Sequence, residues 1–507
     1  MNQNANLTTI LLDKHLPERA EKTAYVCGAR RLSYGELAAN VNRCANWLQA
    51  LGVEPGERVA IALRDGFACV YAVLGCIRRG AIPVLVNILL KRAQCQELME
   101  LSSARRLLSE PVLEAAQACT VDGDPAVMFD DARAEGLLAA YSPEREAHPA
   151  SPDDVAMIFY TSGTTGHPKG VPYRHGQFPY VVEAFASDML RMSEHDVVFS
   201  APKIFFGYGF GNSVLYTLYF GATAVLEPSM MTAPLALEII SRTRPSIFFA
   251  VPTLYNALLQ AMDPDATFPS LRCCVTAGEP LPGAILRAWL NKTGVEMING
   301  YGATETLHIV TSCRLDPAFP EITGSMLRHF ECKVVDEAGN ELEDGEPGIL
   351  LMRGPALAQE YWNDPEWTGK SMLADGWWKS GDLFVKDGTE LAYLGRNDDM
   401  FKVGGMWVSP VQVESALLSH PDVQACAVTA RNTGGLTQAR AHVVLTPGTS
   451  SELETVGQLR SHVLEQLPKY MCPSEIVFCT ALPLTATGKI QRYKLRAEAT
   501  AAPLTAS

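Results

Sequence analysis

Short apolar runs alternate with stretches of helical period between about residues 60 and 300. Runs rich in apolar and β-branched residues predict strands at 59–63, 155–160, 197–200, 223–226, 247–251, 271–276 and 296–299. Apolar residues at helical spacing predict helices between them, at 69–79, 176–189, 234–242, 254–260 and 283–291. Because strands that alternate with helices form parallel sheets covered by helices, this region is predicted to be α/β.

The pattern changes after residue 325. Strands at 332–335 and 348–353 indicate a small β-rich section, and a third unit of strand and helix follows Gly395-Arg396. A chain of 507 residues exceeds the size of one growing core. We therefore predict a large N-terminal domain, 1–395, of parallel-rich sheets covered by helices plus a small β-rich subdomain. A small mobile α+β C-terminal domain, 396–507, is expected after it.

One segment, 204–226, carries no charged residue and is long enough to span a membrane. Its glycines, Asn212, Ser213 and tyrosines favour a buried loop, helix and strand instead. No secretory signal is visible, because the apolar run 7–12 is short and ends at Asp13. We expect no membrane partner.

Composition narrows the possible partners and the compartment. Hydrophobic residues at 47% and charged residues at 19% suit a compact soluble protein, and the net charge of -14 argues against a nucleic-acid surface. The thirteen cysteines, an odd number without a Cys-x-x-Cys pair, fit thiols in a reducing cytoplasm better than disulfides or a zinc site. A homodimer remains possible.

The run 160–170, Tyr-Thr-Ser-Gly-Thr-Thr-Gly-His-Pro-Lys-Gly, directly follows a predicted strand. Glycines let the backbone present N–H groups, hydroxyls add donors, and Lys169 supplies positive charge, so the run predicts a phosphate cradle. Its lysine is followed by Gly-Val-Pro, so the chain should leave as an extended segment and not as the helix of a common nucleotide loop. A polar surface turn is the alternative.

Four later motifs are weak singly. The run 207–211, Gly-Tyr-Gly-Phe-Gly, lacks dinucleotide-binding spacing. The run 299–305 offers an aromatic plane, amides, a hydroxyl and a carboxylate for a base and a metal-bound phosphate. Asp382, after a predicted glycine turn, suits ribose hydroxyls, although an Asx turn is the alternative. Lys489 lies on a predicted tight turn, where a lone lysine is often only solvated.

Together and in this order, these motifs resemble the superfamily of adenylate-forming enzymes, which includes acyl-CoA synthetases, firefly luciferases and the adenylation domains of peptide synthetases. The resemblance extends from 32–37 to Lys489, with at least five ordered motifs. It implies a two-step reaction with ATP, Mg2+ and coenzyme A. A carboxylate attacks the α-phosphate of ATP to give an acyl-adenylate and pyrophosphate, and a thiol then takes the acyl group.

The resemblance implies roles for most of these residues. Nucleotide binding falls to Thr161, Ser162, Gly163, Thr164, Thr165, Gly166, Lys169, Ala277, Gly278, Glu279, Pro280, Asn299, Gly300, Tyr301, Gly302, Asp382 and Arg396. Thr304 and Glu305 would hold magnesium, with Glu305 as the metal ligand, and magnesium and lysine would disperse charge on the departing pyrophosphate. Lys489 would be the catalytic lysine that bridges the substrate carboxylate and the α-phosphate.

The second step is expected to use another face of the C-terminal domain. Asp398 resembles the family's hinge residue, with a surface turn residue as the alternative. After adenylation the domain would swing about it and bring a glycine loop to the thiol arm. The segment expected at this hinge or against coenzyme A contains Asp398, Lys402, Gly404, Gly405 and Trp407.

Within the superfamily, 203–212 and 306–309 look most like benzoate–CoA ligases. The run 205–211 has no carboxylate for a substrate ammonium, and its aromatic and glycine residues predict a flat, apolar slot. The residues expected to bind the acid are Phe205, Gly207, Tyr208, Gly302, His308 and Ile309. Gly207, where the benzoate group tends to have alanine, favours a hydroxy- or amino-benzoate over benzoate. His308 could bond the substituent or only edge the slot.

The function expected is therefore an ATP-dependent aryl-CoA ligase. Two alternatives come from other classes: a free-standing aryl-adenylating enzyme that loads a carrier protein, and a non-catalytic nucleotide-binding protein. Transfer to free CoA separates the first alternative from a ligase. Retention of Lys169, Glu305, Asp382, Arg396 and Lys489 together argues against the second.

Overall fold

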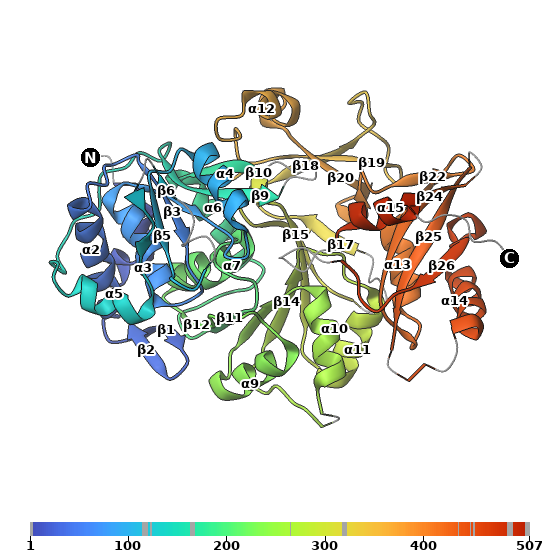
Figure 1. The fold of residues 1–507 in the computed structure, drawn as a ribbon, viewed down its shortest axis with the longest axis horizontal. Coiled ribbons are helices and arrows are strands. Elements are labelled where there is room, and N and C mark those ends of the chain that lie inside the picture. The colour runs from blue at the N-terminus through green and yellow to red at the C-terminus, as the bar shows by residue number, and fades with distance from the viewer. Residues whose placement is uncertain are drawn as a thin grey trace.

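Two large sheets and a separate small C-terminal domain make up the molecule (Figure 1). The structure is a computed structural model, and it describes residues 4–113, 120–121, 124–162, 168–263, 265–316, 322–433, 436–446, 448–449, 452–483 and 490–501. The predicted α/β class is confirmed, since helices cover parallel strands through the N-terminal part.

The larger sheet has thirteen strands, ordered β18-β19-β20-β21-β17-β16-β15-β14-β13-β11-β12-β1-β2. The strands from β15 to β1 in that order are parallel, and antiparallel strands extend the sheet at both ends. Their bounds are β1 (Thr23–Cys27), β2 (Arg30–Ser33), β11 (Val197–Ser200), β12 (Thr223–Leu226), β13 (Ile247–Ala250), β14 (Cys273–Ala277), β15 (Met297–Gly302), β16 (Ile309–Arg314), β17 (Ile322–Met326), β18 (Glu331–Val335), β19 (Pro347–Arg353), β20 (Trp378–Asp387) and β21 (Glu390–Arg396).

The second sheet has six strands in the order β10-β9-β4-β3-β5-β8. All of its pairs are parallel except β9 with β10, which form an antiparallel hairpin. Its strands are β3 (Arg58–Ala62), β4 (Ile82–Leu85), β5 (Arg106–Ser109), β8 (Val127–Met128), β9 (Val155–Ser162) and β10 (Pro168–Arg174), and the short pair β6 (Thr120–Val121) and β7 (Asp124–Pro125) stands apart.

The helices follow from local sequence signals. In α2 (Tyr34–Ala50), the Ser33 hydroxyl accepts from the Glu36 amide and the Glu36 carboxylate accepts from the Ser33 amide, a capping box that fixes the helix start. The other helices of the large domain are α1 (Leu7–Leu11), α3 (Phe67–Arg79), α4 (Arg92–Ser102), α5 (Asp131–Leu138), α6 (Phe178–Val181), α7 (Gly207–Phe210), α8 (Thr217–Phe220), α9 (Ala233–Thr243), α10 (Pro252–Ala261), α11 (Gly283–Thr293) and α12 (Pro365–Ser371). α3 is buried along its whole length, so it is a central helix of the core.

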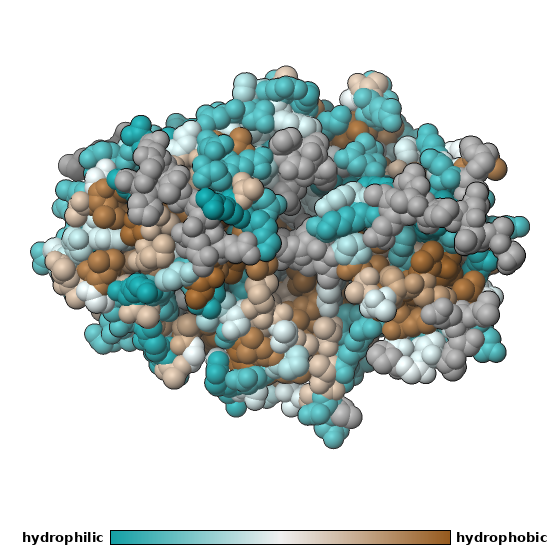
Figure 2. Space-filling view, in the orientation of Figure 1, coloured by the Kyte–Doolittle hydropathy of each residue, from teal (hydrophilic) through white to brown (hydrophobic). Residues whose placement is uncertain are grey.

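The segment 204–226 folds as predicted into a loop, a helix and a strand. α7 continues through a π-helical stretch (Gly211–Tyr216) into α8, and β12 follows inside the larger sheet. Among the described residues, no helix combines the length and the hydrophobicity that crossing a membrane requires. Figure 2 shows hydrophilic and hydrophobic residues intermixed over one face of the molecule.

The small C-terminal domain has its own sheets and its own core. A hairpin of β22 (Phe401–Val403) and β23 (Met406–Val408) precedes α13 (Pro410–Leu418), and a three-stranded sheet follows. That sheet contains β24 (Val423–Thr433), β25 (Leu436–Leu445) and β26 (Glu475–Phe478), with α14 (Glu452–Gln466) and α15 (Arg492–Ala501). Its hydrophobic cluster is drawn from residues 401–478 alone, so this part packs around a separate centre.

Candidate active site

The predicted phosphate cradle joins two antiparallel strands. Thr161 pairs with Lys169 and Ser162 with Pro168 across the β9–β10 hairpin. The predicted extended exit is thus confirmed, because the lysine opens a strand and not a helix. Gly163, Thr164, Thr165 and Gly166 lie outside the described residues.

Lys169 rests on aromatic rings. Its ammonium lies 3.2 Å from the centre of the Trp367 ring on α12 and 5.7 Å from that of Tyr361. Burial lowers the pKa of Lys169, and the nearby Glu305 carboxylate opposes this effect. Sequence reasoning missed both aromatic residues, because they lie almost 200 positions beyond the lysine and only the fold brings them together.

Glu305 lies in a short 3-10 helix (Thr304–Thr306) that directly follows β15. The Tyr361 hydroxyl donates to Glu305 Oε1 at 2.7 Å, and the Ala358 amide donates to the Glu305 carbonyl at 2.8 Å. Burial raises the pKa of the Glu305 carboxyl, which a bound cation would reverse. The segment after β19 therefore fixes this carboxylate.

Glu305 and Thr304 suit magnesium as a donor set. A carboxylate and a hydroxyl offer the oxygen ligands that Mg2+ prefers, and Mg2+ is commonly held by one or two carboxylates together with substrate phosphates. Within the described ranges, no cluster of three or more His, Cys, Asp or Glu side chains forms a complete metal site. The residues fit an ion that arrives with ATP better than a resident one.

A buried network joins three strands at the predicted ribose site. The Tyr301 hydroxyl on β15 donates to Asp382 Oδ2 at 2.7 Å, and Arg396 Nη1 at the end of β21 lies 3.3 Å from Asp382 Oδ1. Asp382 is only 4% exposed, so its charge depends on these partners. The predicted glycine turn before Asp382, and with it the Asx alternative, is wrong: both residues lie within β20. Gly381, with φ +72°, forms an irregularity in that strand.

The predicted adenine-side residues meet at neighbouring strand ends. Ala277 at the end of β14 pairs with Gly300 on β15, and Gly278 turns the chain with φ +86°. The Glu279 carboxylate accepts from the Thr253 hydroxyl at 2.7 Å, and Pro280 is exposed. The backbone oxygen of Asn299 accepts from the Ser312 hydroxyl at 2.6 Å.

The predicted acyl slot is assembled around His308. Its Nε2 lies 3.3 Å from the Tyr208 carbonyl oxygen and 3.2 Å from Asn212 Oδ1, so it acts as the donor to both. Burial lowers the pKa of His308 to about 3, which keeps the ring neutral. The Nδ1 atom is then an acceptor, and it is buried without a hydrogen-bond partner among the described residues.

Glycines allow close packing in the predicted slot. A methyl group on Gly302 would lie 2.2 Å from the His308 carbonyl oxygen, and one on Gly211 would lie 2.1 Å from the His308 ring. A methyl group on Gly207 would meet only the Leu307 carbonyl oxygen, at 3.5 Å, which is ordinary contact. A methyl group on Gly300 would lie 2.5 Å from the Ile309 side chain, so Gly300 allows Ile309 to pack against the backbone. Phe205 is buried and contacts Phe206, with ring centres 4.4 Å apart.

The predicted thiol-side residues form the β22–β23 hairpin. Gly404 and Gly405, with φ +58° and +85°, make its turn, and a methyl group on either would meet no atom within 4 Å. Lys402 lies over the Trp407 ring at 4.5 Å, and Trp407 is 39% exposed. Asp398 is exposed, and Lys489 lies outside the described residues.

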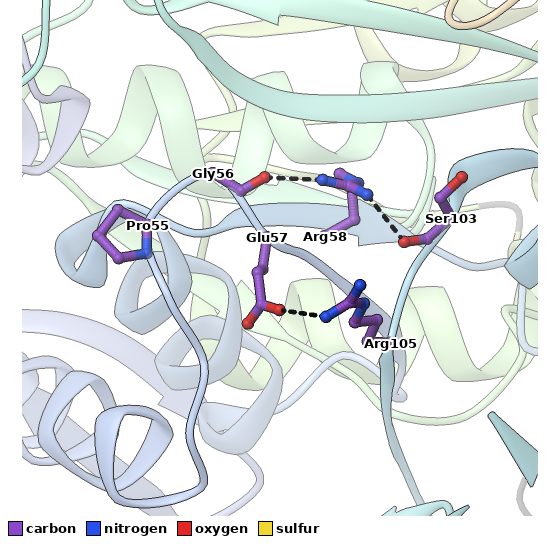
Figure 3. A pocket seen from close by; sticks show the side chains of 6 residues that line it. All are labelled: Pro55, Gly56, Glu57, Arg58, Ser103 and Arg105. Carbon is purple, nitrogen blue, oxygen red and sulfur yellow. Dashed lines mark hydrogen bonds and ion pairs between the residues drawn. The ribbon is translucent and has the colours of Figure 1, made fainter. Parts of the chain in front are cut away.

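A separate hollow of about 310 Å3 lies elsewhere on the large domain (Figure 3). Its lining side chains bind one another, since Arg58 donates to the Gly56 and Ser103 carbonyls and Arg105 faces Glu57 at 3.6 Å. None of its lining residues belongs to the predicted set. This hollow is therefore separate from the candidate active site.

The two sheets with a small C-terminal domain are the fold of the adenylate-forming enzymes. The AMP-binding enzyme family matches residues 12–362 and the AMP-binding enzyme C-terminal domain matches residues 412–489, so the chain belongs to the AMP-binding enzyme family. The resemblance seen in the sequence is confirmed.

Within the AMP-binding enzyme family, the chain is similar to several aryl-CoA ligases. The benzoate–CoA ligase of Thauera aromatica is 38% identical over 494 residues, which cover 95% of this chain and 93% of that protein. The anthranilate CoA ligase AuaEII, solved in complex with anthranoyl-AMP, is 34% identical with a TM-score of 0.90, covering 98% of this chain and 97% of that one. The benzoate CoA ligase of Burkholderia xenovorans LB400 is 35% identical with a TM-score of 0.88, covering 97% and 99%.

Proposed function

We propose that the chain is an ATP-dependent aryl-CoA ligase. A benzoate-type acid attacks the α-phosphate of ATP, which gives the aroyl-adenylate and releases pyrophosphate, and the aroyl group is then transferred to CoA with release of AMP. One observation carries the proposal: β15 belongs to both halves of the site. Tyr301 on this strand binds Asp382, and its neighbour Gly302 packs against His308, so an acid in the slot would meet the nucleotide at the strand end.

In the adenylation step, Asp382 accepts from the ribose hydroxyls and Tyr301 packs on the adenine, with Ala277 to Pro280 beside it. Lys169 binds the phosphates from its place near Glu305. Thr304 and Glu305 would hold Mg2+, which supplies positive charge to the phosphates when bound. Lys489 bridges the acid carboxylate and the α-phosphate, two anions that otherwise repel.

The domain change between the two steps defines the remaining assignments. We assign residues 1–395 to the large domain and 396–507 to the small one, with Asp398 as the hinge. Its exposure between two bonded segments supports this assignment. After adenylation, rotation removes Lys489 and brings the Gly404-Gly405 turn to the thiol arm, where the open space around both glycines allows close approach.

We infer that the acid is a benzoate that carries a hydroxyl or amino group. His308 donates through Nε2 inside the protein, which leaves Nδ1 as a buried acceptor that a substituent N–H or O–H would satisfy. The space at Gly207 supports the same conclusion. A 4-hydroxybenzoate–CoA/benzoate–CoA ligase, 36% identical, and an anthranilate–CoA ligase, 33% identical, are consistent with it.

The test is a panel of acids assayed for AMP release that depends on both ATP and CoA. Benzoate, its hydroxy and amino derivatives, phenylacetate and a fatty acid should separate, with a substituted benzoate having the highest kcat/KM. Failure of free CoA to accept any aroyl group would contradict the ligase and favour loading of a carrier protein.

Lys489→Ala tests the mechanism. It should abolish pyrophosphate exchange into ATP yet leave a supplied aroyl-adenylate able to react with CoA. Equal loss of both half-reactions would refute the assigned role.

A further inference from the structure

The chain that follows Lys489 is anchored by one partly buried arginine. Arg492, the first residue of α15, donates through Nη2 to both carboxylate oxygens of Glu414 on α13, at 2.8 and 2.7 Å. Its Nη1 lies 3.8 Å from Asp399 Oδ2. One turn later, Arg496 donates to the other Asp399 oxygen at 3.1 Å. Figure 1 shows α13 and α15 on the side of the small domain that faces the large one.

These contacts fix the base of the lysine segment. The Gln491 amide donates to the Pro483 carbonyl at 2.8 Å, which holds the residues on either side of 484–490 together. Glu414 is itself fixed, because its Oε1 accepts from the Val428 amide at 2.7 Å. The side chains of Arg492 and Glu414 are 19% and 10% exposed, so solvent screens their ion pair little.

A second hydrogen-bond network, around Arg396, lies next to the Arg492 network along the chain. Arg396, the last residue of β21, pairs with Asp382 of the large domain, and the Asn397 amide donates to the Gly381 carbonyl at 3.0 Å. Asp399 already pairs with Arg492 and Arg496 in the small domain. Only Asn397 and Asp398, both exposed, separate the two networks. A rotation at Asp398 would leave these side-chain pairs intact on each side and would change the hydrogen bonds that the Asp399 and Met400 amides donate to the Arg396 carbonyl.

We propose that Arg492 is a positioning residue for adenylation, because it ties the base of the Lys489 segment to Asp399 on the rotating side of the hinge. The start of α15 then moves with α13 and Asp399 as one body. This inference rests on the proposed roles of Lys489 and Asp398. Loosening the network should slow the step in which Lys489 acts and spare the transfer to CoA.

The test separates the two half-reactions in Arg492→Lys, which keeps the charge but has one nitrogen in place of the two that reach Glu414 and Asp399. Adenylation is measured by pyrophosphate exchange into ATP, and transfer is measured with supplied aroyl-adenylate and CoA. We expect the adenylation kcat to fall about 10- to 100-fold, the KM for ATP to change less than threefold, and transfer to stay within twofold. Asp399→Asn should give a smaller loss in the same half-reaction.

Two controls show whether the effect is only structural. Arg440→Lys alters another arginine–carboxylate pair of the small domain, between Arg440 on β25 and Glu475 on β26. Lys494→Arg changes an exposed cation on α15 itself. Both should leave both half-reactions within twofold, and thermal unfolding should match between Arg440→Lys and Arg492→Lys.

Three outcomes would overturn the inference. Arg492→Lys could lower both half-reactions equally, Arg440→Lys could reproduce its selective loss, or adenylation could stay at the wild-type rate in Arg492→Lys. Lys489→Ala, assayed in parallel, identifies the source of a failure. If it loses adenylation alone while Arg492→Lys loses nothing, only the positioning role fails. If it does not lose adenylation alone, the proposed mechanism fails and the positioning role with it.

Discussion

The two halves of the site are built by different means. The proposed nucleotide half is held by hydrogen bonds to carboxylates, between strands from Tyr301 through Asp382 to Arg396 and outside the strands from Tyr361 to Glu305. In the proposed acyl slot, glycines allow close packing around one neutral histidine. Charged networks fail when one member is lost, whereas a steric slot changes its preference with each added methyl group. We therefore expect a fixed nucleotide and an adjustable acid.

The largest effect is expected in the nucleotide half, from Asp382→Ala. The variant removes the ribose acceptor and leaves Arg396 and the Tyr301 hydroxyl without their buried partner. A loss of about 3 kcal/mol corresponds to about a 10²-fold fall in kcat/KM for ATP, measured by AMP release. Asp387→Ala, an exposed aspartate on the same strand, is the control. An equal rise in KM for the acid would contradict the division between the halves.

Gly302→Ala should be almost as damaging, but without selectivity among acids. Its methyl group would lie 2.2 Å from the His308 carbonyl oxygen, and backbone cannot yield as a side chain can. We expect kcat/KM to fall about 30-fold or more for every benzoate in the panel, from a shift of about 2 kcal/mol. Gly136→Ala on α5, where no atom lies within 4 Å, should leave activity unchanged. Selective loss for one acid would mean that the slot relaxes.

Gly207→Ala should change the preference instead of the overall rate. Its methyl group would meet only the Leu307 carbonyl oxygen, at 3.5 Å, so the cost falls on a substrate that lies beside Gly207. Substituted benzoates should lose about 10-fold in kcat/KM and benzoate less than about twofold, since one methyl group in a slot is worth 1–3 kcal/mol. Equal losses across the acids would put Gly207 outside the slot.

His308 should make the stability of the protein decrease at low pH. Its pKa is lowered to about 3, so the unfolded chain takes up a proton near pH 6.5 that the folded protein refuses. Stability therefore increases with pH between about 3 and 6.5 and is lost as pH falls. From pH 7.5 to pH 5, the wild type should lose about 2 kcal/mol more unfolding free energy than His308→Gln does, measured in urea. A difference that does not change with pH would contradict a neutral, buried ring.

Sequence reasoning succeeded where residues adjacent in the chain act together. The extended exit at Lys169 could be predicted, because the Gly-Val-Pro run that follows the lysine is a local signal against a helix. It failed where contacts join distant segments. No spacing rule links Trp367 to Lys169 or Tyr361 to Glu305.

Backbone detail was lost for a related reason. Asp382 follows a glycine that reads as a turn, yet neighbouring strands β19 and β21 hold the segment in a sheet with one irregularity. Tertiary pairing overrides the local preference of Ser-Gly-Asp for a turn. The small domain's networks were also missed, because Arg492 and Asp399 are 93 positions apart.

Trp367→Leu is the mildest test of the nucleotide half. Lys169 has three N–H donors, so its ammonium can rest on the ring and still bind a phosphate oxygen, and the ring then pre-orients the lysine. A cation–π contact at a half-exposed site is worth about 0.5–1 kcal/mol, so KM for ATP should rise about threefold with the KM of the acid unchanged. Trp377→Leu, which removes a ring faced by Lys333 and Arg353, should have no effect on either constant. A lower KM for ATP would mean that the ring competes with the phosphates for Lys169, and the nucleotide half would then be less preorganised than its charged network implies.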